Sequence, residues 1–348
     1  MPTARSSFIR TCEARLSCMA RARPSLLLCM VLAVCVSALN VACGEVPPAA
    51  APGLASIPAG VPYPSSAAYD PEARVLLVGS YADGTIKRVS ATGELRRVAP
   101  ELPRDGRERV LRIRIDPERQ RVWVLASDGL YLYDSMSLRL TSRIPVDALS
   151  QHSNEHCLPD MALDRSGALF VSSAMTPMLM RVDATSLEVS HYDVHTDSDH
   201  GKDFGFSAIV FAGEEEVLYA ASALTGALWK LDLVQNHATK MALSEPIVGA
   251  CALRAAPAGT PAAKVGTNLV LYVAGGFRDG VKRVELSRTD VPSRVTVMPT
   301  TRQLIVPTDL VVVEQGLLAV TSRLSQLPDF NGEPTPKSPF MLVPISTK

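Results

Sequence analysis

Side chains that commonly bind metals are concentrated in two short stretches of this 348-residue chain. The first stretch contributes His152, His156 and Asp160, and the second contributes His200 and Asp203. Imidazole and carboxylate groups that converge on one point can hold a divalent metal ion. The spacing matches no compact metal motif such as His-Glu-x-x-His. The alternative interpretation is that these are solvated loop residues, since polar residues favour loops.

These stretches lead into two of six related segments, each an apolar run followed by a turn and a second apolar run. The six segments are Pro64–Asp70, Val110–Asp116, Leu158–Asp164, Gly205–Phe211, Val248–Arg254 and Pro307–Val313. They recur about every 45 residues, a period typical of propeller blades. Their β-branched runs, separated by Asp, Pro and Gly, are typical of short strands. The sequence therefore predicts an all-β fold, a six-bladed β-propeller of four-stranded blades.

The repeat also sets the expected domain organisation and the way the ring closes. The propeller is expected over residues 64–348, and the blades at about 64–103, 104–147, 148–194, 195–245, 246–300 and 301–348. The sixth repeat has only three evident strands, the last at Phe340–Ile345. We expect the N-terminal segment Leu54–Ile57 to supply its outer strand, which would close the last blade and remove an open edge. The insertion Leu324–Ser338 is expected to be a lid or surface decoration.

The first strand of each blade is expected to line the central channel. If side chains alternate, the third residue of each repeat points toward that channel. These positions form the predicted ligand site on the channel face: Ser66, Arg112, Asp160, Ser207 and Asp309, with Ala250 in the fifth repeat. One arginine and two aspartates could bind a small polar ligand. The alternative is that Arg112 and an aspartate neutralise each other as a buried ion pair.

The N-terminal 63 residues are predicted to precede the propeller repeats and, apart from the closing segment Leu54–Ile57, to lie outside the fold. Residues 1–42 have the layout of an export signal, with basic residues before the apolar stretch Leu26–Leu39; translation could also start at Met19. Cys43 follows as the expected lipidation site of a bacterial lipoprotein. Ordinary cleavage after Gly44 is the alternative. Residues 43–63 are rich in proline and alanine and are expected to form a tether.

Charge and cysteine content narrow the range of partners. The chain has 35 basic and 35 acidic residues, but residues 1–42 hold five Arg and one Glu, so the remainder has a net charge of −4. No basic patch indicates nucleic acid binding. Only two cysteines, Cys157 and Cys251, lie beyond Cys43, and two cysteines do not form a disulfide framework. We expect a monomer that contacts the membrane only through a lipid anchor.

Two segments, Leu158–Ser173 and Glu216–Asp232, resemble blades of the SMP-30/gluconolactonase/LRE-like propellers. The resemblance implies a six-bladed fold and, in the lactonases, one divalent cation held in the channel by Glu, Asn and Asp. Aligned with this sequence, those ligands fall on Ser65, Phe206 and Gly249, and a substrate-contacting Asn falls on Pro159. Such side chains supply at most one weak oxygen ligand. The resemblance therefore supports the fold and not the family's hydrolytic mechanism.

Three functions are compatible with these features. The first is an exported, lipid-anchored binding module in the periplasm or outer membrane of a bacterium, which takes a small polar molecule or an envelope protein on its channel face. The second is a divergent metal-dependent, lactonase-like hydrolase that uses the His/Asp cluster. The third is a purely structural envelope module. No Gly-x-Ser-x-Gly nucleophile motif occurs in a strand-to-helix context.

Overall fold

The computed structural model describes most of the repeat region and none of the leader. The described residues are 57–91, 102–103, 105–149, 159–196, 205–213, 217–256, 269–275, 280–287, 291–298, 307–314, 316–322 and 340–346. The export signal, Cys43, most of the tether and the predicted lid lie outside these ranges. In the part of the chain that is described, no helix has the length and apolarity needed to span a membrane.

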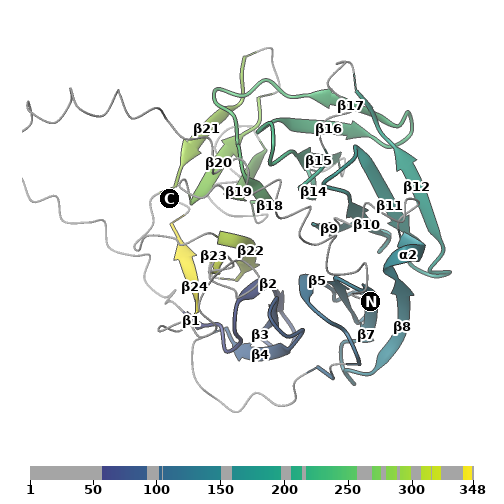
Figure 1. Cartoon of the computed structure of the whole chain (residues 1–348). Coiled ribbons are helices and arrows are strands. Elements are labelled where there is room, and N and C mark those ends of the chain that lie inside the picture. The colour runs from purple at the N-terminus through teal and green to yellow at the C-terminus, as the bar shows by residue number, and fades with distance from the viewer. Residues whose placement is uncertain are drawn as a thin grey trace, which may run out of the picture. The chain divides into compact units, whose positions relative to one another are not determined.

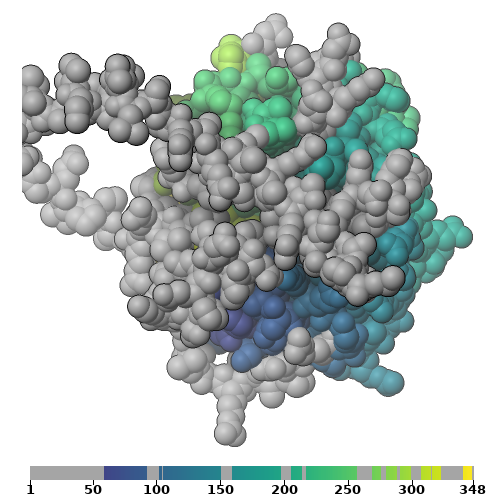
Figure 2. All heavy atoms as spheres, viewed as in Figure 1, coloured from purple at the N-terminus to yellow at the C-terminus, as the bar shows by residue number. Residues whose placement is uncertain are grey.

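Six antiparallel sheets surround a central axis as the blades of a propeller, which confirms the predicted fold (Figure 1). The first long strand of each blade lies innermost, and consecutive innermost strands contact one another around the ring. Figure 2 shows the same face as spheres, with blades one and two (purple to blue) opposite blades four and five (teal to green). The alternation of β-branched runs with Asp, Pro and Gly turns therefore produces a closed all-β ring.

The first three blades follow the chain from the centre outward. Blade one contains three described strands, β2 (Pro64–Asp70), β3 (Val75–Ser80) and β4 (Ile86–Ser90). Blade two contains β5 (Val110–Asp116), β6 (Arg121–Ala126), β7 (Gly129–Asp134) and β8 (Leu140–Pro145), followed by the short helix α2 (Val146–Leu149). Blade three contains β9 (Met161–Leu163), β10 (Leu169–Ser172), β11 (Met178–Val182) and β12 (Val189–Asp193).

Blade four departs from the simple pattern. It contains β14 (Ala208–Ala212), β15 (Val217–Ala221), β16 (Leu228–Asp232) and β17 (His237–Lys240). A two-residue strand, β13 (His195–Thr196), adds a fifth, parallel strand outside β17. Blade five contains β18 (Ala250–Ala255), β19 (Val270–Gly275), β20 (Val281–Glu285) and β21 (Arg294–Val297).

Blade six is completed by the N-terminal segment, as the sequence predicts. Its strands are β22 (Pro307–Val313), β23 (Gly316–Thr321), β24 (Met341–Ile345) and β1 (Ile57–Pro58). Ile57 pairs with Leu342 and Pro58 with Met341 in antiparallel register. The amide of Ala59 also donates to the carbonyl of Phe340 at 2.9 Å. The closing strand thus lies a few residues later than Leu54–Ile57, whose first three residues are not described.

The apolar core is divided among the interfaces between blades. Six clusters of buried side chains each combine residues from two neighbouring blades, one cluster for each interface. The cluster between blades six and one contains Leu318 and Val320 together with Leu76 and Val78. Burial of this apolar surface is the main force that holds the blades together. The central axis is left to a different set of side chains, most of which are polar.

Candidate functional site

Irregularities at the start of the innermost strands decide which side chains face the channel. In blades one, two, five and six, a bulge inserts one residue there; in blade five it lies between Ala250 and Ala252. An inserted residue shifts the alternation of side chains by one position. Blade five therefore places Ala252, not Ala250, opposite Ala274 of its second strand. In blade four, Ala208 pairs with Ala221.

These strand pairings show which residue of each blade faces the channel, and they correct two of the six positions predicted from the sequence. Ser66, Arg112 and Asp309 keep the equivalent channel position, paired with Gly79, Leu125 and Val320. The amide of Ser172 donates to the carbonyl of Asp160, which gives Asp160 the same position in blade three. Ala208 and Ala252 complete this layer in place of Ser207 and Ala250.

The residue directly before the channel position ties four of the blades to the next blade. The hydroxyl of Ser65 donates to the carbonyl of Gly79 within blade one (3.3 Å) and to that of Val110 in blade two (2.6 Å). Ser207 bonds in the same way to Ala221 (3.0 Å) and to Ala250 of blade five (2.6 Å). Equivalent contacts are made by Thr308 to Pro64 and by the thiol of Cys251 to Pro307. Ser207 was predicted to face the channel as part of a ligand site. Its hydroxyl instead joins blades four and five.

Removal of one such hydroxyl should measurably weaken the ring. Ser65→Ala removes a buried hydroxyl proton that is shared between the Val110 and Gly79 carbonyls, so we expect the free energy of unfolding to fall by about 1–2 kcal/mol. Urea denaturation measures this change, and Ser142→Ala, on the outer strand β8, is the control. Equal stability of the two variants would show that the Ser65 hydroxyl contributes nothing to the contact between blades one and two.

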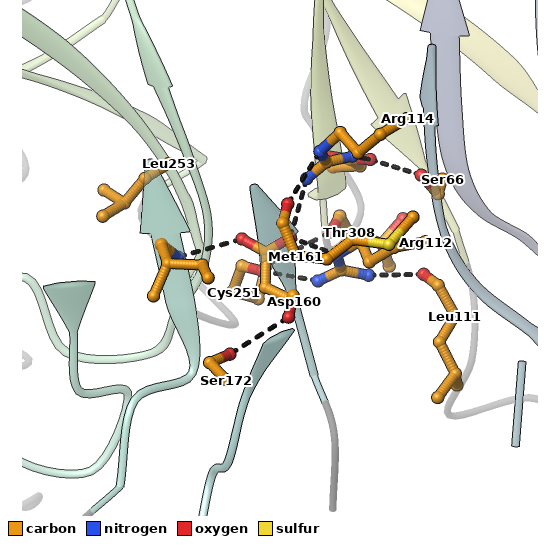
Figure 3. Close-up of polar contacts among 12 residues, drawn as sticks. Ser66, Leu111, Arg112, Arg114, Asp160, Met161, Ser172, Cys251, Leu253 and Thr308 are labelled. Atoms are coloured by element: carbon orange, nitrogen blue, oxygen red, sulfur yellow. Dashed lines mark hydrogen bonds and ion pairs between the residues drawn. The ribbon is translucent and has the colours of Figure 1, made fainter. Parts of the chain in front are cut away.

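Asp160 is the centre of a buried ion network that spans the channel (Figure 3). Its side chain is fully buried, and Oδ1 accepts hydrogen bonds from Arg112 Nε at 3.1 Å and from Arg114 Nη2 at 2.7 Å. Oδ2 accepts the amide of Ile209 in blade four at 3.0 Å. The ion-pair interpretation of Arg112 is thus confirmed. Arg112 also donates across the channel to the carbonyl of Cys251 in blade five.

Asp309 is the second carboxylate of the network and is also fully buried. Its Oδ2 accepts a hydrogen bond from the Ser66 hydroxyl at 2.5 Å and lies 3.6 Å from Arg114 Nη1. Its Oδ1 contacts Arg254 Nη2 and accepts the amide of Leu310. We call Ser66, Arg112, Arg114, Asp160, Arg254 and Asp309 the channel network.

The same arginine–aspartate unit occurs twice, on opposite sides of the ring. In blades two and three, Arg114 donates to the carbonyls of Ile113 and Met161 and to Asp160. In blades five and six, Arg254 makes the matching contacts to Leu253, Leu310 and Asp309. Arg112 has no counterpart, because Ala252 takes its place in blade five.

Arg114 and Arg254 are two channel residues that sequence reasoning missed. Each lies two residues after the channel position of its blade, so strict alternation places it on the same face. Arg114 could have been found by extending the alternation from Arg112. Arg254 was hidden by the displaced alignment of blade five, which counted from Val248.

The pKa shifts reflect this crowding of charges. Burial and then the neighbouring Arg254 lower the pKa of Arg114 to about 10. Burial also opposes the charge of Arg112, but Asp160 and Asp309 outweigh it and raise the pKa of that guanidinium. Burial raises the pKa of the Cys251 thiol to about 12, so this group is neutral at physiological pH. These shifts favour the charged form of the Arg112 guanidinium and the uncharged form of the neighbouring Cys251 thiol.

Acid should weaken the fold through Asp309. Burial favours its neutral form, but the arginines, led by Arg254, outweigh this and hold the pKa of its carboxyl below the ordinary value. In the unfolded chain this carboxyl takes up its proton near pH 4, so its stabilising effect is present above about pH 4 and is lost as the pH falls further. We expect the difference in urea stability between the unsubstituted protein and Asp309→Asn to shrink from pH 5 to about pH 3. A constant difference over that range would contradict this assignment.

Of the predicted metal site, only Asp160 is described. Both of its oxygens already accept hydrogen bonds from Arg112, Arg114 and Ile209, which leaves it poorly suited to bind a cation. His152, His156, His200 and Asp203 lie outside the described residues. Across the described ranges, no group of three or more His, Cys, Asp or Glu side chains is arranged to hold a metal ion.

Comparison with solved structures supports the fold alone. The chain is similar to the crystal structure of the major Malassezia sympodialis allergen Mala s 1, with a TM-score of 0.60 and 18% identity over 85% of this chain and 97% of that one. It is also similar to a Bacteroides thetaiotaomicron protein of unknown function, with a TM-score of 0.52 and 13% identity over 75% of this chain and 67% of that one.

A third similar structure is Kuenenia stuttgartiensis hydrazine synthase, with a TM-score of 0.51 and 13% identity over 75% of this chain and 74% of that one. No protein-family model matches the chain, and no curated protein matches it. A likeness at this level of identity indicates a shared six-bladed propeller and says nothing about chemistry.

Proposed function

We propose that this protein is a binding module that takes a small polar molecule or an envelope protein on the face around its central channel. The observation that carries the proposal is the channel network itself. Five charged side chains from blades two, three, five and six meet at the axis, and each is at most 14% exposed. Burying charges is costly, and apolar side chains of similar size often stabilise a core as well or better. A binding role explains why the axis is polar.

As part of this proposal, the chain is a divergent relative of the SMP-30/gluconolactonase/LRE-like propellers that has lost their metal chemistry. The pairings between strands refine the alignment, since Ser65, Ser207 and Cys251 each directly precede the channel position of their blade. The Asn and Asp of the lactonases then fall on Ser207 and Cys251 rather than on Phe206 and Gly249. Two hydroxyls and a neutral thiol are a poor set of ligands for a hard cation.

The same proposal places the protein outside the cytoplasm, in the periplasm or on the outer membrane of a bacterium. Its support is the layout of residues 1–42 and the cysteine at position 43. Metabolic labelling with a palmitate analogue should mark the unsubstituted protein and not Cys43→Ala. A soluble, unlabelled secreted protein in both cases would overturn the lipid anchor and leave export standing.

The binding role is tested on purified protein that lacks residues 1–43. We expect no stoichiometric metal, no hydrolysis of simple lactones, and at least one hit in a thermal-shift screen of anionic, cationic and neutral small molecules or of envelope proteins. That hit should slow amide hydrogen exchange in the innermost strands β2, β5, β9, β14, β18 and β22 more than in the outer strands.

Two outcomes would overturn the proposal. The first is a stoichiometric metal that is lost in a His156→Ala/Asp203→Ala variant and accompanies lactone hydrolysis, which would establish the divergent hydrolase. The second is a complete lack of binding by every class of compound and protein, which would leave a structural envelope module.

A further inference from the structure

The charges of the channel network do not balance. Three guanidiniums, those of Arg112, Arg114 and Arg254, face two carboxylates, those of Asp160 and Asp309, which leaves one positive charge in excess among the described residues. The thiol of Cys251, which lies beside them, is neutral and does not compensate. An uncompensated charge that is mostly buried favours a counter-charge of opposite sign.

The carboxylates of the network have little capacity left for a ligand. Asp160 accepts two guanidinium hydrogen bonds and one amide hydrogen bond. Asp309 accepts the Ser66 hydroxyl, the Leu310 amide and Arg254. A cationic ligand would find these oxygens occupied and the surrounding potential positive. This arrangement disfavours amines and metal ions as the channel ligand.

The guanidiniums, by contrast, retain donors. Arg112 makes three hydrogen bonds, and two of them go to the carbonyls of Leu111 and Cys251, which are neutral. A guanidinium carries more N–H groups than this, in a planar fork that suits a carboxylate. The side chains of Arg112, Arg114 and Arg254 are 9%, 14% and 13% exposed, whereas both carboxylates are fully buried. The accessible part of the network is therefore its positive part.

The excess charge can be assigned to one residue. Arg114 and Arg254 each have an aspartate in the two matching units, whereas Arg112 shares Asp160 with Arg114. Ala208 and Ala252, the channel residues of blades four and five, bring no further charge. Arg112 reaches toward blade five, where it donates to the backbone carbonyl of Cys251 (Figure 3).

We propose that the channel binds an organic monocarboxylate whose negative charge is neutralised chiefly by Arg112. One excess positive charge matches one carboxylate, and a hydrogen bond between charged groups is stronger than one to a neutral group. This inference rests on the proposed binding role and specifies the chemical class of its small ligand.

Matched pairs of compounds test the inference by isothermal titration at low ionic strength. Lactate, benzoate and galacturonate are compared with lactamide, benzamide and galactose on protein lacking residues 1–43. We expect at least one carboxylate to bind at one site per chain and its neutral partner to bind at least about tenfold more weakly. Equal affinities within each pair, or no carboxylate that binds, would overturn the inference.

Two variants locate the site. Arg112→Met removes the excess charge and should abolish carboxylate binding, whereas Arg139→Met removes the same charge from an exposed position and should leave it unchanged. Arg112→Lys keeps the charge without the planar fork and should retain weaker binding. Thermal unfolding monitored by circular dichroism establishes that each variant is folded. Carboxylate binding that survives in folded Arg112→Met would overturn the assignment.

If Arg112→Met does not fold, the paired compounds on the unsubstituted protein still decide the question. A neutral or cationic compound that protects the innermost strands would refute the monocarboxylate and leave the binding role intact. A lack of binding by every class would refute both proposals. The two failures are therefore distinguishable.

Discussion

Asp160→Asn is expected to lower the free energy of unfolding by about 3–5 kcal/mol, because it leaves two buried guanidiniums without their counter-charge. Asparagine has nearly the same shape as aspartate but is neutral, so Arg112 and Arg114 would both lose their ion pair with residue 160. The remaining carboxylate, Asp309, would face three arginines. Urea denaturation and thermal melting measure the loss.

The control for this variant is Asp193→Asn, which makes the same chemical change at an exposed position of blade three. A second comparison separates charge from packing. The double variant Arg112→Met/Asp160→Asn removes one charge of each sign. Its loss in free energy of unfolding should therefore be smaller than the sum of the losses of the two single variants. If Asp160→Asn unfolds within about 1 kcal/mol of Asp193→Asn, the channel network contributes nothing to stability.

Deletion of residues 50–60 is expected to lower the melting temperature by about 10 °C or more. The deletion removes the pairing of Ile57 and Pro58 with β24, and it removes Ala59 from the core cluster between blades six and one. It also exposes the edge of β24, which can then pair with another chain. Light scattering should therefore detect association as well as the loss of stability.

The control is a deletion of equal length, residues 44–54, in protein that likewise lacks residues 1–43. These residues precede the pairing segment, so their loss should leave the melting temperature unchanged. Identical melting curves for the two deletions would contradict a stabilising role for β1.

The fold could be predicted from sequence because its determinants are local. Each repeat carries its own strands and turn, and Asp70, Asp116 and Asp164 mark the same turn in blades one to three. Their carboxylates accept backbone amides within those turns. The missing outer strand of blade six could likewise be inferred, because an unpaired edge requires a partner.

The channel network could be predicted only in part. Blades four and five have Ala212 and Ala256 where the first three blades have the turn aspartate, so the repeats had no common residue for alignment there. The fourth repeat was therefore aligned one residue too early, from Gly205, and the fifth two residues too early, from Val248. The errors at Ser207 and Ala250, and the omission of Arg254, follow from this displacement.

The closure of blade six has a consequence for how the chain folds. Strand β1 is the first strand of the chain that the structure describes, and its partner β24 is the last. Five blades can form from neighbouring segments, but the sixth requires contact between positions as distant as Ile57 and Leu342. Contacts of such high sequence separation slow folding. The joining of the two ends of the chain should therefore be the final and slowest step, and until it occurs the edge of β24 remains open.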